Sequence, residues 1–139
     1  MSAPSIAGYR SRKVFRKTIT FTGAAGAGAI GTVAVATIAG CICIEFLNAR
    51  CTVDLVGAGT IEMGISGDTA SLIAQIADAT NLDAGEQWTD ATPSKVATPV
   101  TAKLVDDNIV ITIGAADITA GVIEVEFYYV PMSQDGFAS

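Results

Sequence analysis

The chain has 139 residues, of which half are apolar and only 16% are charged. A chain of this length forms one domain and buries roughly two thirds of the surface that it exposes when unfolded. Gly, Ala, Thr and Val are abundant and Lys is scarce, a composition typical of β-rich proteins with tight turns. The composition therefore argues against a chain that is disordered as a whole.

Charge is distributed unevenly along the chain, whose net charge is −6. Five of the eight basic residues lie in the first 17 positions, namely Arg10, Arg12, Lys13, Arg16 and Lys17. The rest of the chain has three basic and fourteen acidic residues, a net charge of −11. So acidic a body would be repelled by nucleic acid. The basic segment suits an acidic partner surface, or else it is a solvated tail.

The segment from Ile19 to Phe46 carries a single charge, Glu45, and must be buried. Its Gly and Ala content and its lack of Leu disfavour a transmembrane or signal segment. Residues 26–31 match the dinucleotide-binding pattern Gly-x-Gly-x-x-Gly. However, residues 32–39, where the helix of that motif would begin, include five β-branched residues, which disfavour a helix. We therefore expect two strands here.

Taken in order, the chain predicts about eight short strands with turn signals roughly every ten residues. Residues 70–76 fit either a short helix capped by Asp68 and Thr69 or a strand. The pattern predicts an all-β fold, an antiparallel β-sandwich or a jelly-roll-like barrel with at most one short helix. The expected strands are one that includes Val14, Ile19 and Phe21, then residues 32–38, 41–48, 51–56 and 60–65, a hairpin of 102–105 and 108–113 around Asp106 and Asp107, and 122–130.

Alternation along two of these strands predicts which side chains face the core. Ile42, Ile44 and Phe46 share one face, which we expect to be buried. Residues 122–130 alternate between an apolar face and an acidic face that we expect to meet solvent. We expect an extended basic arm at residues 1–17, one β domain at 18–131 and a tail at 132–139.

The sequence offers little support for an enzyme. There is no His, so Ser-His-Asp and Cys-His arrangements are impossible. Neighbouring acids, such as Asp83 with Glu86 or Asp106 with Asp107, are typical of solvated turns. We expect no enzymatic activity and no cofactor.

The three cysteines, Cys41, Cys43 and Cys51, fit neither a disulfide framework nor a zinc site, because their number is odd and a fourth ligand is missing. We expect buried free thiols and no metal. The single tryptophan, Trp88, is expected to be a core or interface anchor rather than a ligand-stacking residue.

Three stretches, residues 21–33, 72–93 and 118–136, carry a resemblance that extends over residues 20–136. There the chain resembles small virion proteins of tailed bacteriophages, of the kind that decorate or cement the capsid shell. The matching stretches are turns and strands of a scaffold, and the basic segment at residues 1–17 lies outside them.

The resemblance implies a non-enzymatic structural protein on the capsid surface of the virion, assembled in the host cytoplasm. Its partner would be the major capsid protein, and a homotrimer is the first expectation, with no membrane partner and no nucleic acid. The basic residues 10–17 lie outside the resemblance, and from their charge we expect them to dock on the shell by charge complementarity. The alternative is a tail-fibre, baseplate or receptor-binding module, which would present aromatic side chains such as Trp88, Tyr128 and Tyr129 to a host molecule.

Overall fold

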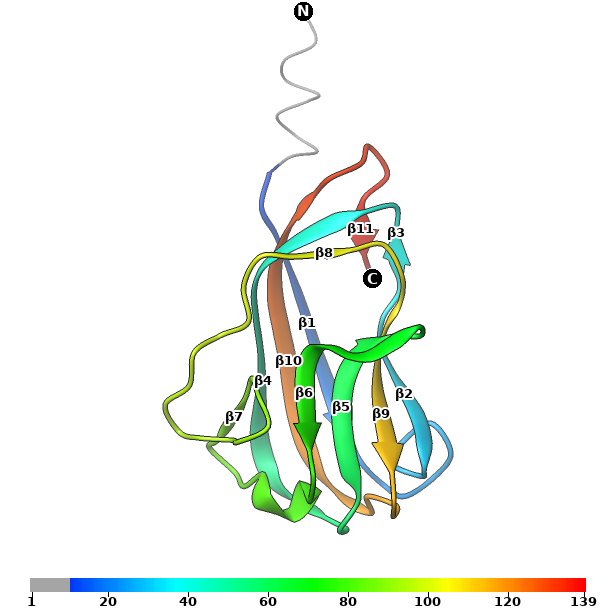
Figure 1. Ribbon diagram of the computed structural model, residues 1–139, viewed down its shortest axis with the longest axis vertical. Helices are drawn as coiled ribbons and strands as arrows, with labels where there is room; N and C mark the ends of the chain where they lie inside the picture. The colour runs from blue at the N-terminus through cyan, green and yellow to red at the C-terminus, as the bar shows by residue number, and fades with distance from the viewer. Residues whose placement is uncertain (1–10) are drawn as a thin grey trace, which may run out of the picture.

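Two antiparallel sheets face each other in the computed structural model, which describes residues 11–139 (Figure 1). One sheet has the order β1-β10-β4, with β7 and β8 both paired to β4, and the other has the order β2-β9-β5-β6. The predicted all-β fold is confirmed. The strands are β1 Lys13–Thr20, β2 Gly31–Ala36, β3 Ile38–Ala39, β4 Ile42–Val56, β5 Thr60–Ile65, β6 Asp68–Ile76, β7 Gln87–Trp88, β8 Lys103–Val105, β9 Ile109–Gly114, β10 Ala120–Pro131 and β11 Phe137–Ala138.

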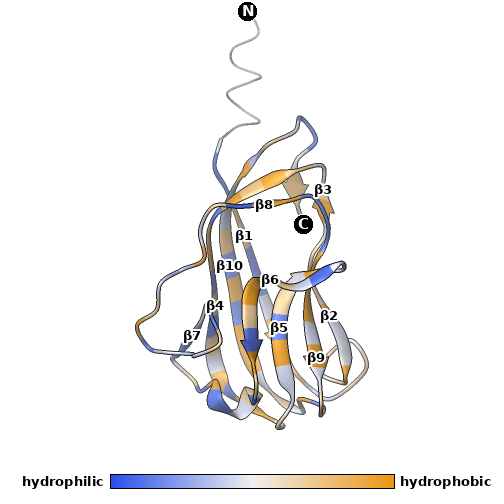
Figure 2. Cartoon of the chain, viewed as in Figure 1, coloured by the Kyte–Doolittle hydropathy of each residue, from blue (hydrophilic) through white to orange (hydrophobic). Residues whose placement is uncertain are grey.

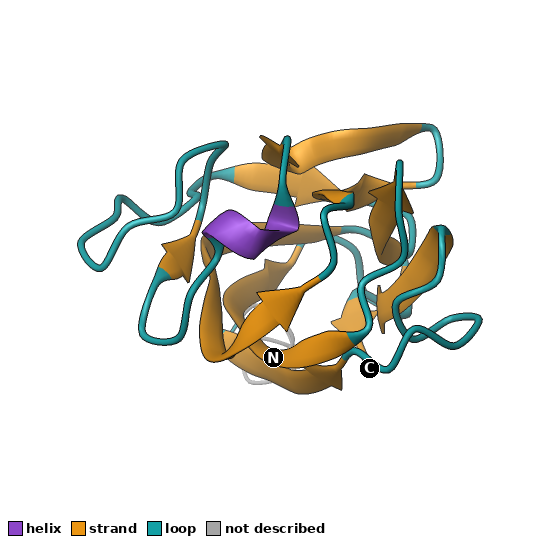
Figure 3. Ribbon diagram, turned by 90° about the horizontal axis from the view of Figure 1, so that it is seen from below, coloured by secondary structure: helices purple, strands orange, loops and turns teal. Residues whose placement is uncertain are grey.

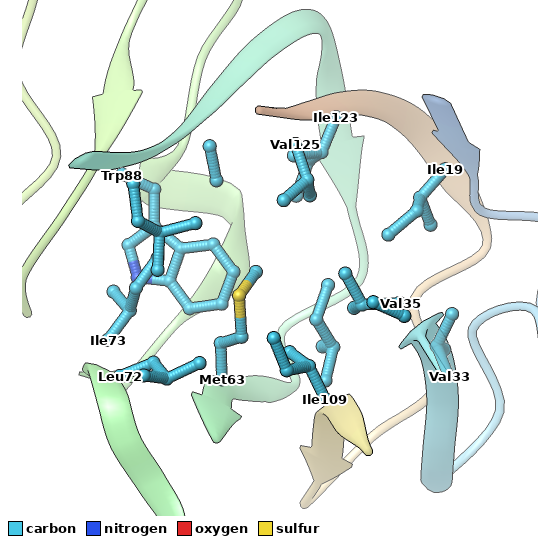
Figure 4. Packing of buried hydrophobic residues seen from close by; sticks show 14 of the residues in the cluster. Ile19, Val33, Val35, Met63, Leu72, Ile73, Trp88, Ile109, Ile123 and Val125 are labelled. Carbon is cyan, nitrogen blue, oxygen red and sulfur yellow. The ribbon is translucent and has the colours of Figure 1, made fainter. Parts of the chain in front are cut away.

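The core lies between the two sheets and is built from alternate residues of each strand. Figure 4 shows Trp88, Met63 and Ile73 packed together in this core. All three are fully buried, and the indole Nε1 of Trp88 donates a hydrogen bond to the Ala74 carbonyl at 3.3 Å. Burial of each such side chain stabilises the fold by about 1.5–3 kcal/mol before entropy is counted. The only helical element of residues 11–139 is the 3-10 turn η1, Ala79–Asn81, at the lower end of the sandwich (Figure 3).

The two faces predicted for the last strand are confirmed in β10. Ile123, Val125 and Phe127 are buried, whereas Glu124 is exposed and Glu126 is half-buried. β10 pairs with β1 on one side and with β4 on the other, so it is the centre of its sheet.

The prediction for residues 41–56 is partly wrong, because one continuous strand, β4, replaces two strands and the break between them. Ile42 and Ile44 are buried as expected, but Phe46 lies on the opposite face and Leu47 takes its place in the core. The cause is a β-bulge: Tyr129 pairs with Ile44 and Tyr128 with Phe46, so Glu45 has no partner residue on β10.

The ambiguous residues 70–76 form a strand, β6, which pairs with β5. Two register shifts in this pairing bury the consecutive residues Leu72 and Ile73 and then Ile76. Bulges thus produced the spacing that resembles a helix.

The expected hairpin around Asp106 and Asp107 is wrong. β8 pairs with β4, whereas β9 pairs with β2 and β5 in the other sheet. Val105 of β8 and alternate residues of β9 face one core from opposite sheets, so the turn carries the chain across the sandwich instead of joining neighbouring strands.

The expected arm and tail overlap with strands. β1 begins at Lys13 and buries Phe15 and Ile19, so residues 13–17 belong to the sheet. β11 lies within the expected tail and pairs with β3. Residues 1–10, including Arg10, lie outside the described residues.

The glycine-rich residues 26–30 lie in the loop between β1 and β2, and Gly31 begins β2, so this segment is not a nucleotide-binding turn before a helix. Gly28 has φ of +126°, and its carbonyl accepts a hydrogen bond from Ile118 N at 2.7 Å. Ile30 N donates to Asp117 Oδ1 at 2.9 Å. The loop is therefore tied to the turn before β10. No helix among residues 11–139 is long and apolar enough to cross a membrane.

The thiols differ in their surroundings. Cys51 is buried as expected, and its Sγ donates to the Val53 carbonyl at 3.0 Å. Cys41 and Cys43 are only half-buried, so the expectation of burial was wrong for these two. Burial raises the pKa of Cys51 to about 11.

We predict that Gly28→Ala destabilises the protein by about 3 kcal/mol and lowers its melting temperature by roughly 10 °C. A Cβ at Gly28 would lie 2.0 Å from the Ile118 carbonyl oxygen, at a backbone φ that L-residues avoid. The matched control is Gly26→Ala, where φ is also positive but no atom lies within 4 Å of the added Cβ. Its cost is about 1 kcal/mol. Thermal unfolding followed by circular dichroism measures both, and equal melting temperatures would contradict the packing described.

We also predict that Cys51 does not react with a thiol reagent in the folded protein at pH 8, because its pKa is about 11 and the residue is buried. Thiol counting should give at most two equivalents before denaturation and three after it. Because the pKa of Cys51 is higher in the folded than in the unfolded chain, the neutral thiol contributes to stability at pH values below the ordinary thiol pKa. This contribution is lost as the pH rises towards 11. In Cys51→Ala the equivalent released by denaturation should disappear; rapid reaction of three thiols in the native wild type would refute the assignment.

Candidate functional site

The candidate site lies on the outer face of the β1-β10-β4 sheet, the face turned away from the second sheet. In an antiparallel sheet, residues directly opposite each other point to the same side. The register therefore aligns outward residues in rows across β1, β10 and β4. The three rows are Val14, Tyr128 and Phe46; Arg16, Glu126 and Asn48; and Thr18, Glu124 and Arg50.

Two ion pairs bind basic residues of the N-terminal region to this face. Arg16 Nε donates to Glu126 Oε2, and Arg12 Nε donates to Glu45 Oε1 at 2.8 Å. The hydrogen bond that Arg16 donates to Glu126 raises the pKa of Arg16, and the bond to Glu45 raises the pKa of Arg12. Both pairs are open to solvent, so they orient side chains more than they stabilise the fold.

The other predicted docking residues lie elsewhere. Lys17 Nζ donates to the Ala34 carbonyl at 3.1 Å and so connects the edge strands β1 and β2. The ammonium of Lys13 makes no hydrogen bond or ion pair with another residue of 11–139. Among the basic side chains of β1, Lys13 is thus the one without such a bond inside the described part of the chain.

The three predicted aromatic anchors are not together on the surface. Trp88 and Tyr129 are core residues, and Tyr129 Oη accepts a hydrogen bond from Ala138 N at 3.2 Å. Tyr128 is half-buried on the outer face, with its ring centroid 5.4 Å from that of Phe46. Of the three, Tyr128 alone is placed to meet another molecule.

Two hollows of about 320 and 300 Å³ lie on the outer face and share Phe46 and Asn48. The first extends over β1 and β10, and the second extends towards β7 and the loop that follows it. The residues that line the first include Arg16, Arg50, Glu124 and Glu126, and those of the second include Gln87, Thr89, Lys95 and Val96.

Asn48 lies on the boundary between the hollows. Its Nδ2 donates to Gln87 Oε1, whereas its Oδ1 is buried and has no hydrogen-bond partner within residues 11–139. A buried acceptor without a partner costs about 1–3 kcal/mol. The sequence analysis missed Asn48 and Arg50, because it placed a break there and because their neighbours come from distant strands.

The acidic pairs considered in the sequence act as turn residues. Glu86 Oε1 accepts a hydrogen bond from Asp83 N, and Asp107 Oδ1 accepts one from Asn108 N. Each carboxylate thus satisfies a backbone donor, as acids in turns commonly do.

No family model matches the chain, and no curated protein matches it either. Among solved structures, the fold is similar to that of a chain in the cyanophage Pam1 capsid asymmetric unit, with a TM-score of 0.56. The match covers 86% of this chain and 84% of that chain, with 17% sequence identity. At this level of identity the likeness shows a shared fold.

Proposed function

We propose that the chain is a non-enzymatic virion structural protein of a tailed bacteriophage, which binds the outside of the capsid shell and decorates or cements it. The observation that carries this proposal is the fold shared with a chain of a phage capsid asymmetric unit. Because the match covers similar shares of both chains, the two are close in length, and the likeness is between whole chains. This supports a small accessory protein of the shell.

Docking uses the end of the sandwich where β1 begins. Val14 is 50% exposed there, beside Tyr128, and Leu104 on β8 is 69% exposed. Figure 2 shows this end of the sandwich, where β8 runs beside the start of β4. An acidic shell surface with apolar contacts at its centre would be complementary to this end of the sandwich. Such a surface would meet the exposed apolar side chains, the ammonium of Lys13 and the basic residues before it.

The partner under this proposal is the major capsid protein, and copies of the chain meet as trimers on the shell. The described body is acidic, which keeps separate copies from aggregating and disfavours nucleic acid as the partner. Arg12, Arg16 and Lys17 contribute mainly by fixing the start of the chain and β1 to the body, while Arg10 and Lys13 supply the charge that meets the shell.

We predict that the full chain binds emptied, undecorated phage heads saturably, and that deletion of residues 1–11 weakens binding by about tenfold or more. This deletion leaves β1 intact, since the strand begins at Lys13. Cosedimentation with the heads measures the bound fraction.

A matched pair of charge reversals tests the role of the docking end. Lys13→Glu should weaken binding, whereas Lys95→Glu, with the same change in net charge away from β1, should not. Binding should also fall as salt is raised. Failure of the full chain to bind heads would contradict the proposal and favour a tail or receptor-binding module.

A further inference from the structure

The two hollows on the outer face form one shallow trough that crosses β4, with Phe46 and Asn48 common to both sides. We propose that this trough binds a neutral oligosaccharide. This activity goes beyond attachment to a shell and uses different residues from the docking end.

The first argument is the free hydrogen-bonding capacity of the trough. Asn48 Oδ1 is buried without a partner within residues 11–139, and its amide is held in place by the bond to Gln87. Arg50 makes no hydrogen bond or ion pair with those residues through its side chain, so its donors are also available. Arg50 therefore offers free donors to the trough, and Asn48 holds an unpaired acceptor beneath its surface, which a ligand hydroxyl reaches once the side chains above it shift. Sugar hydroxyl groups donate and accept at once, so they match this combination.

The second argument is the balance of charge. Glu126 is paired with Arg16, and Glu124 lies opposite Arg50 in the sheet. Two lysines also line the trough: Lys17, whose Nζ is bonded to the Ala34 carbonyl, and Lys95 at the far wall. An anionic peptide would find Arg50 and Lys95 but would also meet these two carboxylates, and a cationic ligand would meet the basic side chains. A neutral polar ligand experiences neither of these electrostatic repulsions.

The third argument is the aromatic floor. Phe46 is half-buried beside Tyr128 and lines both hollows. A sugar ring has an apolar C–H face, which can cover an aromatic ring while the hydroxyl groups at its rim reach polar side chains. The β-bulge at Glu45 is what turns Phe46 outward.

The dimensions fit a short chain of sugars. Each hollow, at about 320 or 300 Å³, is near the lower limit of ligand sites, which is about 300 Å³. The loop after β7 provides the far wall, where Val96 is 88% exposed. Two adjoining sites of this size suit two or three sugar units that lie across β4.

The test uses the isotope-labelled full chain and two-dimensional NMR. Maltotriose, cellotriose and N-acetylchitotriose are the neutral probes, each titrated to about 10 mM so that a Kd near 1 mM is measurable. Hexaglutamate is the acidic-peptide probe. We expect at least one trisaccharide to shift the side-chain amide signals of Asn48 and Gln87 saturably, with little effect from hexaglutamate.

Variants locate the site. Asn48→Ala and, independently, Arg50→Gln should each weaken saccharide binding by about tenfold, the loss typical of one hydrogen bond. Arg50 is exposed, so its variant keeps the test decisive if Asn48→Ala does not fold. The matched control is Gln75→Ala, an exposed residue of β6 in the other sheet, which should bind as the wild type does.

The proposal is overturned if none of the trisaccharides shifts these signals, if hexaglutamate alone binds there, or if both trough variants bind as well as the wild type. Head binding is measured separately. A chain that binds heads but no saccharide refutes only the trough, and a chain that binds saccharide but not heads refutes only the shell role.

Discussion

The register of β10 is the constraint on which the rest of the structure depends. This strand pairs along β1 on one side and along β4 on the other. It places Ile123, Val125 and Phe127 in the core and its glutamates outside. A slip by one residue would bury Glu124 and Glu126. Burying an unpaired carboxylate costs more free energy than the pairing of one strand contributes. The correct register simultaneously aligns Arg16, Glu126 and Asn48 on the outer face.

The β-bulge in β4 connects this fold to the candidate site. Glu45 is the extra residue of the bulge, and its carboxylate forms an ion pair with Arg12. The bulge exchanges Phe46 for Leu47 in the core and leaves the aromatic ring on the surface. One inserted residue thus supplies both a contact for the N-terminal region and the floor of the trough.

Much of the fold could be predicted from local patterns, because alternation and β-branched residues act over a few positions. The faces of β10 and the rejection of a nucleotide-binding loop at residues 26–31 follow from such patterns. The bulges in β4 and β6 could not be foreseen, since a register shift depends on the partner strand. The supposed hairpin failed for the same reason: β9 alternates well and β8 is only three residues long, and neither pattern says which sheet the strand joins.

Most of the candidate site could not be predicted from the sequence. Gln87 and Asn48 lie 39 positions apart, and Arg16 and Glu126 lie 110 positions apart. Only the pairing of β1, β10, β4 and β7 brings them together. Charge along the chain draws attention to the N-terminal region, but it could not show that Arg12, Arg16 and Lys17 bind other parts of the protein while Lys13 makes no such bond within residues 11–139.

Under the proposed function, this sandwich sits on the outside of a phage head with the start of β1 towards the shell. A cryo-EM reconstruction of emptied heads saturated with the full chain tests it most directly. The account predicts sandwich-shaped density on the outer surface, with the end that carries Val14 and Leu104 against the shell and the opposite end, with η1, towards solvent. Density inside the shell, on the tail alone, or with η1 against the shell would contradict it.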